Sequence, residues 1–484
     1  MKEHIIGRTR EINRLQRYMA SDHSEFIAIY GRRRIGKTFL VRELFEREFT
    51  FRITAKENAT TREQLMNFAE VMQRMTGTAC RIHDWSQAFR MLANYIEQDI
   101  TTSPKIIFFD ELPWFDTRGT KFVSALEHFW NDWASYRHDI KLIVCGSATT
   151  WMLNKVLNAR GGLHNRVTHS ILLEPFTLRE TELYFRSRGF GYDRDEILQC
   201  YMAMGGVAYY LSLFEIDKSV AQNIDMLCFT RGGELVTEFN RMLMSLFRKA
   251  EKHIAVITAL QTRGMGLTRE DIIEQAKQVN NGNLTALLRE LEECDFIRSY
   301  VPFGKAKKDK LYQLIDPFIL FYFRFMHGRN NLGGNYWLKM QSKQDYKSWC
   351  GYAFEVVCLN HIEQLVHALG IDGSINTPCS WSYRPLPQTI SNSDDDDLKH
   401  RAQIDLLIDR SDQTINVCEM KFSHHEFVIT ADNNEAMAQR LRIFSRVTKT
   451  HKSLQPVYIT PHGLADNAYA RLMPRTITAN DLFT

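Results

Sequence analysis

Eight consecutive residues near the N-terminus match the spacing G-x-x-x-x-G-K-[ST]. Glycines let such a loop curl so that its backbone N–H groups point at phosphate oxygens, while the lysine neutralises the β- and γ-phosphates and the hydroxyl binds Mg²⁺. The loop lies between an apolar run, 26–30, and an amphipathic stretch, Thr38–Glu48, which is the required strand–loop–helix context. The sequence therefore predicts a nucleoside triphosphate site rather than the alternative, a basic turn. The predicted loop residues are Gly31, Arg32, Arg33, Arg34, Ile35, Gly36, Lys37 and Thr38.

A second apolar run, 105–110, ends in two adjacent carboxylates. Beside a phosphate-binding loop, Asp110 would hold Mg²⁺ through water, and Glu111 would polarise the attacking water. The alternative is a buried strand that simply ends in exposed acids.

Two further polar residues are candidates for the same site. Ser147 ends a buried-type strand, 141–145, and could contact the γ-phosphate, or it could precede a helix at Thr149–Asn154. Arg166 follows a glycine-containing segment and is either an arginine finger or a surface arginine. An arginine that acts in trans would require a homo-oligomer or a partner protein.

Carboxylates also gather in the C-terminal third of the sequence. Asp405 lies in an apolar strand, 403–409, and the return strand, 415–422, carries Glu419 and Lys421 on one face, across the hairpin from Asp405. Upstream, Glu355 adds an acid on a helix expected over 351–369. Converging carboxylates can hold a divalent cation, and a neighbouring lysine can orient or deprotonate water for attack on a phosphodiester.

The residues between these regions predict a compact helical unit with a hairpin. A capping box at Thr268–Asp271 begins one helix, 283–293 forms a second, and 299–313 is a hairpin with a lysine-rich tip at 304–310. This is the pattern of a winged helix, whose second helix would enter a DNA groove. Because that helix is rich in acids, the alternative is a structural unit that packs on the N-terminal part.

These residues need particular elements to position them. Strands alternate with helices up to about residue 175, which favours an α/β fold with a parallel sheet covered by helices on both faces. A helical region follows to about residue 246, and a Gly/Asn-rich break at 330–335 precedes a β-rich α/β region. We expect three domains: 1–240 with the phosphate-binding loop and a helical lid, 241–330 as the winged helix, and 336–484.

Composition narrows the class of protein. The chain has 484 residues, of which 44% are hydrophobic and 24% charged, and the net charge of +4 is too small to indicate nucleic-acid binding by itself. No apolar run is long enough to span a membrane, and the apolar stretch at 254–260 has only seven residues. Nine scattered cysteines form no CxxC pair, which fits a reducing cytoplasm better than a disulfide framework or a zinc site.

The N-terminal motifs together resemble the archaeal-type P-loop ATPases of the AAA+/STAND group. The resemblance covers roughly the first 240 residues, and it implies ATP binding and hydrolysis with Gly7 and Arg8 near the adenine. It departs at Ala208, where the family usually has proline. The motifs that carry it are Ile6–Arg8 with Glu11, Gly31–Thr38, Asp110–Trp114, Gly146–Ser147, Glu174–Phe176, Gly205–Val207 and Tyr209–Leu211.

The C-terminal constellation resembles the PD-(D/E)XK nuclease superfamily, in the order helix Glu, strand Asp and then E-x-K. The resemblance implies that Glu355, Asp405 and Glu419 bind metal and that Lys421 is catalytic. We therefore expect a protein that couples ATP and Mg²⁺ binding to DNA binding or metal-dependent DNA cleavage. Two alternatives stay open: an ATP-dependent switch whose nuclease-like domain is inactive, and a winged-helix regulator.

Overall fold

The computed structural model describes most of the chain, and its residues fall into two compact units. The described residues are 5–98, 104–117, 119–147, 149–157, 163, 165–247, 250–329, 335–373, 378–386 and 395–484. Unit 1 comprises Met1–Pro175, Val207–Tyr209 and Ser245–Arg248, and unit 2 comprises Phe176–Gly206, Tyr210–Met244 and Lys249–Thr484. In the part of the chain that is described, no helix has the length and apolar character needed to cross a membrane.

Unit 1 is built on five parallel strands in the order β2-β3-β4-β1-β5. Its three central strands are almost entirely buried, as expected for a parallel sheet covered on both faces. The expected α/β class with a parallel sheet is therefore confirmed. The strands are β1 (Glu25–Tyr30), β2 (Phe49–Thr54), β3 (Lys105–Asp110), β4 (Ile140–Gly146) and β5 (His169–Leu172).

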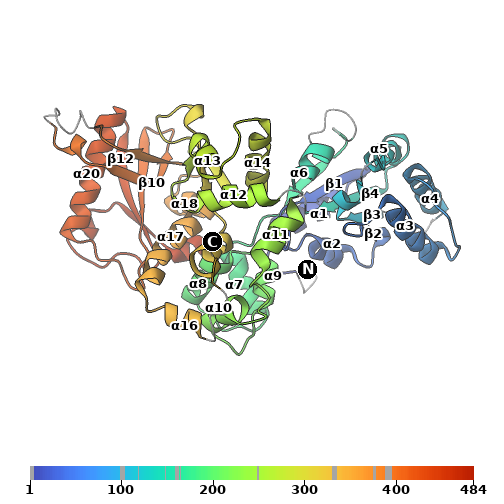
Figure 1. Cartoon of the computed structure of the whole chain (residues 1–484), viewed down its shortest axis with the longest axis horizontal. Coiled ribbons are helices and arrows are strands. Elements are labelled where there is room, and N and C mark those ends of the chain that lie inside the picture. Colours follow the sequence, from blue (N-terminus) through green and yellow to red (C-terminus); the bar gives the residue numbers. More distant parts are fainter. Residues whose placement is uncertain are drawn as a thin grey trace. The chain divides into compact units, whose positions relative to one another are not determined.

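Helices pack on both faces of this sheet, because alternate strand residues point in opposite directions (Figure 1). Ile27 and Ile29 pack with helices α1 and α2, whereas Phe26 and Ala28 pack with α3, α4 and α5. The short α6 (Thr149–Met152) follows β4. The five covering helices are α1 (Thr9–Met19), α2 (Lys37–Phe45), α3 (Thr61–Thr76), α4 (Trp85–Gln98) and α5 (Phe122–Asp132).

The region after the sheet is helical, as the sequence predicts. Three of its helices begin with capping boxes, in which Thr177, Asp193 and Ser219 each accept a hydrogen bond from the backbone three residues later. The helices are α7 (Leu178–Ser187), α8 (Arg194–Met204), α9 (Ala208–Ser212), α10 (Val220–Phe229) and α11 (Glu238–Leu246).

The next segment of unit 2 combines helices with a three-stranded antiparallel sheet, in the strand order β6-β8-β7. Thr268 caps α13 in a capping box with Asp271, as the sequence predicts. The elements are α12 (Ala250–Leu260), β6 (Leu267–Thr268), α13 (Arg269–Gln275), α14 (Gly282–Glu293), β7 (Ile297–Tyr300) and β8 (Leu311–Leu314).

Aromatic side chains join the next helices. The Trp337 ring lies 4.9 Å from Phe321 and 5.7 Å from Trp349, measured between centroids. This cluster fixes α17, which carries Glu355. The elements are α15 (Pro317–Phe321), the π-helical turn Tyr322–Met326, α16 (Tyr336–Met340) and α17 (Gln344–Asn360).

The C-terminal sheet has the order β13-β12-β11-β10-β9, with antiparallel pairs from β9 to β11 and parallel pairs beyond. The expectation of one helix over 351–369 is wrong: α17 ends at Asn360, and α18 (Ile362–Leu369) is separate. His361 breaks the helix, because its buried ring accepts a hydrogen bond from the Leu178 backbone. The remaining elements are β9 (Cys379–Tyr383), β10 (Ala402–Asp409), β11 (Thr414–Met420), α20 (Ala431–Thr448), β12 (Ser453–Thr460) and β13 (Arg475–Thr478).

Candidate functional site

The loop between β1 and α2 has a backbone that only glycine tolerates at two points. Gly31 has φ +140°, and a Cβ there would lie 2.3 Å from the Leu173 carbonyl oxygen. Gly36 has φ +95°, and a Cβ there would meet nothing within 4 Å, so this side of the loop is open. The ammonium of Lys37 is buried and donates hydrogen bonds to the carbonyl oxygens of Gly31 and Arg32, at 2.9 and 2.8 Å. The loop is therefore curled around the lysine amine.

The side chains between the two glycines take different directions. Arg32 and Ile35 are buried, while Arg33 is half-exposed and its guanidinium lies 3.6 Å from the Glu57 carboxylate. Arg34 has a positive φ of 75°, and its guanidinium carbon lies 4.1 Å from the centroid of the Tyr209 ring. The arginines of the loop therefore support its shape as well as supply positive charge.

The N-terminal Gly7–Arg8 pair is brought against this loop. Both residues have positive φ, and Arg8 precedes α1 directly. The Arg8 guanidinium donates to the Ile35 carbonyl oxygen at 3.3 Å and is buried. The two segments therefore lie side by side, and the adenine-side role of Gly7 and Arg8 stays a prediction.

The predicted metal ligands meet at the start of α2 and the end of β3. The Thr38 hydroxyl donates to both Asp110 carboxylate oxygens, at 2.9 and 3.1 Å. Burial, followed by the charge of Glu111, raises the pKa of Asp110 to about 6, against the lowering effect of the Thr38 hydrogen bond. This donor set of hydroxyl and carboxylate oxygens fits the hard ion Mg²⁺.

Glu111 and Ser147 are also paired. The Glu111 Oε2 accepts hydrogen bonds from the Ser147 hydroxyl at 2.8 Å and from the Ser147 N–H at 3.2 Å. Glu111 itself has a positive φ of 51°, which is uncommon for a residue other than glycine and turns the chain directly after β3. Ser147 therefore contacts a carboxylate of the same predicted site, and both its predicted γ-phosphate contact and its alternative as a helix cap stay predictions.

Arg166 is exposed, and its backbone N–H donates to the Leu163 carbonyl oxygen. Most of the glycine-containing segment before it lies outside the described residues. The structure therefore leaves the arginine-finger role as a prediction.

Two contributors to this site were not assigned a role from sequence. Thr54, at the end of β2, places its hydroxyl 3.5 Å from Asp110 Oδ2, and Tyr209 contacts Arg34. A threonine at the end of a strand next to β3 is a signal that could have been used, because carboxyl ends of parallel strands share one edge. Tyr209 is remote in sequence and was identified only within the family motif Tyr209–Leu211, without a role of its own.

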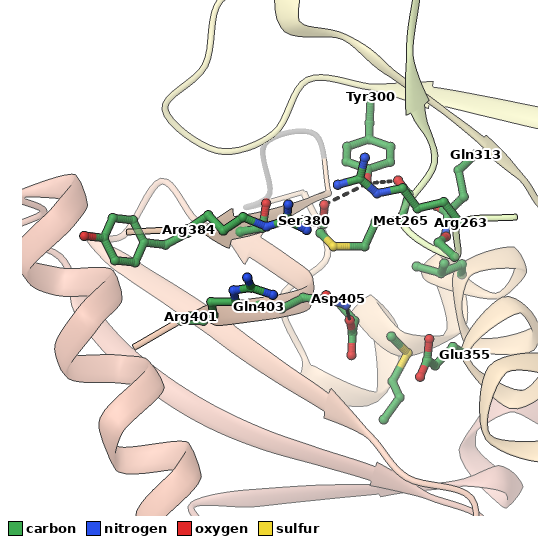
Figure 2. A pocket seen from close by; sticks show the side chains of 16 residues that line it. Arg263, Met265, Tyr300, Gln313, Glu355, Ser380, Arg384, Arg401, Gln403 and Asp405 are labelled. Carbon is green, nitrogen blue, oxygen red and sulfur yellow. Dashed lines mark hydrogen bonds between the residues drawn. The ribbon is translucent and has the colours of Figure 1, made fainter. Parts of the chain in front are cut away.

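Two of the C-terminal candidate residues, Asp405 and Glu355, lie beside a β-bulge and a pocket. The pairing of β10 with β9 shifts by one residue between Ile404 and Leu407, so that Asp405 lies in a β-bulge. Bulges re-aim side chains and recur beside active sites. Asp405 and Glu355 both line a pocket in unit 2 (Figure 2). Burial, followed by the charge of Asp405, raises the pKa of Glu355 to about 8.

Glu419 is engaged by two cations. Its carboxylate is buried, lies 2.8 Å from the Lys421 ammonium and accepts a hydrogen bond from Arg440 of α20. Nowhere among the described residues do three His, Cys, Asp or Glu side chains come close enough together to hold a metal ion. The predicted set of Glu355, Asp405, Glu419 and Lys421 is thus gathered in one region but not arranged around one point.

Comparison with known proteins matches the N-terminal part of the chain to one protein family. Residues 5–214 match the family described as an ATPase domain predominantly from Archaea. The uncharacterized protein MJECL04 of Methanocaldococcus jannaschii is 24% identical over 371 residues, covering 75% of this chain and 78% of that protein.

Solved structures also match part of this chain. The Walker-type ATPase PABY2304 of Pyrococcus abyssi is 17% identical, covers 66% of this chain and 96% of its own, and has a TM-score of 0.48. The ORC2 protein of Aeropyrum pernix, in its ADPNP–ADP complexes, is 14% identical, covers 65% of this chain and 92% of its own, and has a TM-score of 0.39.

Proposed function

Because residues 5–214 form an ATPase domain of archaeal type, we propose that this chain binds ATP with Mg²⁺ and hydrolyses it. The observation that carries the proposal is the pairing of Thr38 with Asp110 directly beside the curled loop of Lys37. A hydroxyl and a carboxylate at this place are the two groups that such a site needs on its metal.

Each residue has a separate task in this proposal. Lys37 binds the β- and γ-phosphates, and Thr38 and Asp110 hold Mg²⁺, which when bound neutralises charge on the phosphate oxygens. Glu111 orients the attacking water, and Ser147 fixes the rotamer of Glu111 through its two hydrogen bonds. Gly7 and Arg8 form the adenine side of the site.

Unit 2 carries the second half of the proposal. The 241–330 segment is a winged helix, and 336–484 is a PD-(D/E)XK-like domain. Glu355, Asp405 and Glu419 would have to converge to bind a divalent cation there, and Lys421 would then be catalytic. The supporting observation is that Asp405 on a bulge and Glu355 on α17 line one pocket. The nucleotide state of unit 1 then governs DNA binding or cleavage by unit 2, in a cytoplasmic protein.

One observation favours a second function. Lys421 and Arg440 both neutralise Glu419, which leaves this carboxylate committed to cations of the protein itself. A domain that keeps this arrangement would bind DNA without cutting it. The chain would then act as an ATP-dependent switch with an inactive nuclease-like domain.

A cleavage assay separates the two functions. Plasmid and linear DNA are incubated with Mn²⁺ or Mg²⁺, with and without ATP, using the unchanged chain, Lys421→Ala and Lys37→Ala. Cleavage that disappears in Lys421→Ala supports the nuclease, and its loss in Lys37→Ala shows that ATP governs it. Intact ATP hydrolysis without cleavage in any condition supports the switch, and equal cleavage by the unchanged chain and Lys37→Ala contradicts the coupling.

A further inference from the structure

The pocket that contains Asp405 and Glu355 has two walls from different parts of unit 2. One wall is the polar face of β9 and β10, and the other comes from the loop between α12 and β6 together with β7 and β8. Its volume is about 390 Å³. This lies near the lower end of the ~300–1,000 Å³ that pockets for single small ligands occupy.

The polar face follows from strand alternation. Ser382 pairs with Gln403 and both are exposed, whereas Trp381 pairs with Ile404 and both are buried in the core. The same alternation places Arg384, directly after β9, and Arg401, directly before β10, on this polar face, and both arginines line the pocket.

Basic and acidic side chains are separated along the pocket. Arg384 and Arg401 lie at one end, and Glu355 and Asp405 lie at the other (Figure 2). Arg263 reaches in from the opposite wall, and its ion pair with Asp271 is loose, at 4.0 Å. Phosphate groups are therefore attracted to the arginine end of the pocket.

Hydrogen bonds connect the second wall of the pocket to the first. The Ser380 hydroxyl donates to the Tyr300 oxygen at 2.8 Å, and the Tyr300 hydroxyl donates to the Met265 carbonyl oxygen at 2.6 Å. The Phe303 N–H donates to the Ser380 carbonyl oxygen at 3.0 Å. Hydrogen bonds therefore join the loop between α12 and β6 to β7, and β7 with the residues after it to β9, and so hold the space between the walls.

We propose that this pocket admits an unpaired polynucleotide strand, with Arg263, Arg384 and Arg401 on its phosphates and one nucleotide directed toward Asp405 and Glu355. The proposal deepens the proposed nucleic-acid function of unit 2 and rests on it. A single nucleotide matches the volume of about 390 Å³ between the walls, whereas the two paired strands of a duplex exceed the space between walls joined through Tyr300. The substrate class is therefore a single strand or a frayed strand end.

Binding to the full chain tests this without any cleavage. Fluorescence anisotropy is measured in EDTA with a labelled single strand and a duplex of equal length, in DNA and RNA form, over a range of salt concentrations. At least one single strand should bind at least tenfold more tightly than either duplex. The Arg384→Ala/Arg401→Ala double variant should weaken that binding about tenfold and reduce the salt slope by about 1.4, since each phosphate contact on a single strand contributes about 0.7.

Arg471→Ala is the matched control. Arg471 is exposed, donates two hydrogen bonds to the exposed carboxylate of Asp466 and lies outside the pocket lining, so its loss removes one positive charge without touching the site. Equal affinity for duplexes and single strands, or a double variant with unchanged affinity and salt slope, would overturn the proposal.

A second readout locates the strand. A photoreactive thymidine analogue in the bound oligonucleotide should crosslink to Tyr300 or Met265, and crosslinks confined to the lysines of 305–310 would contradict the pocket. Because the assay contains no divalent ion, loss of nuclease activity and loss of strand binding are observed separately. A chain that binds a single strand here but never cleaves would retain this inference and overturn the nuclease.

Discussion

Arg34 of the phosphate-binding loop stacks its guanidinium over the ring of Tyr209, 4.1 Å from the ring centroid, although 175 positions separate the two residues. The Tyr209 N–H also donates to the Arg34 carbonyl oxygen at 3.1 Å. Val207–Tyr209 belongs to unit 1, and the residues on either side of it belong to unit 2. The loop that would hold ATP therefore contacts the short segment through which the chain passes between the units.

Removing the Tyr209 ring should loosen the loop. Tyr209→Leu keeps an apolar side chain but eliminates a cation–π contact, for which about 0.5–1 kcal/mol is typical at a partly exposed position. We expect ATP affinity to fall about two- to fivefold in a titration with a fluorescent ATP analogue. Tyr136→Leu is the control, because Tyr136 is 79% exposed in the same unit; equal effects of the two substitutions would contradict the role of the stacking.

The Thr38 hydroxyl should be needed to bind Mg²⁺ for ATP hydrolysis. Thr38→Val retains the shape of the side chain but leaves the buried Asp110 without its principal hydroxyl donor, whereas Thr38→Ser retains that donor. We expect the rate of Mg²⁺-dependent ATP hydrolysis to fall about 100-fold in Thr38→Val and less than tenfold in Thr38→Ser, on the scale of single catalytic contacts. A Thr38→Val rate within a few-fold of the unchanged chain would exclude the hydroxyl from the metal site.

Gly206 should not accept any side chain. A Cβ there would lie 1.8 Å from the Phe176 carbonyl oxygen, which is backbone and cannot move aside easily. The Phe176 N–H also donates to the Gly206 carbonyl oxygen at 2.7 Å, so displacement would break this pairing. Gly206→Ala should destabilise unit 2 by about 3 kcal/mol or more in urea unfolding. Gly191→Ala, where a Cβ meets nothing within 4 Å, should have little effect, and similar values for both variants would refute the steric argument.

Stability should fall in mild acid because of His361. Burial lowers the pKa of this imidazole to about 4, and its Nε2 accepts a hydrogen bond from the Leu178 N–H. The folded state is therefore more stable when the imidazole is neutral. The unfolded pKa is about 6.5, so this stabilisation is complete above about pH 6.5 and is lost as the pH falls toward 4, with a total of about 3 kcal/mol.

The comparison of urea unfolding at pH 7 and pH 5 measures this effect. His361→Gln keeps an acceptor for the Leu178 N–H but does not titrate. The unchanged chain should lose about 2 kcal/mol more than His361→Gln between these pH values. Identical pH dependence in the two proteins would show that other groups cause the acid sensitivity.

Continuous apolar runs made the central strands of unit 1 predictable. The run at 105–110 is buried along its whole length in β3, and its end places Asp110 beside Thr38. The edge strand β5 was missed because it has only four residues, begins with His169 and Ser170, and pairs with β1 alone. Hydrophobic patterning carries little information for so short an edge strand.

Local spacing also predicted which carboxylates gather in the C-terminal region, but not their geometry. The bulge at Asp405 depends on pairing with β9, and the salt bridge of Arg440 with Glu419 brings together α20 and β11. Neither contact has a local sequence signature. His361 likewise ends α17 through a partner 183 positions earlier, which explains why one long helix was expected.

The most direct test of the central claim is ATP hydrolysis by Glu111→Gln, measured with ATP binding on the same protein. Glutamine can still accept a hydrogen bond from Ser147, but it cannot act as a base toward water. The account predicts that ATP binds within about threefold of the unchanged affinity while hydrolysis slows at least ~100-fold. Lys37→Ala should instead lose binding. Hydrolysis by Glu111→Gln at the unchanged rate would contradict the account.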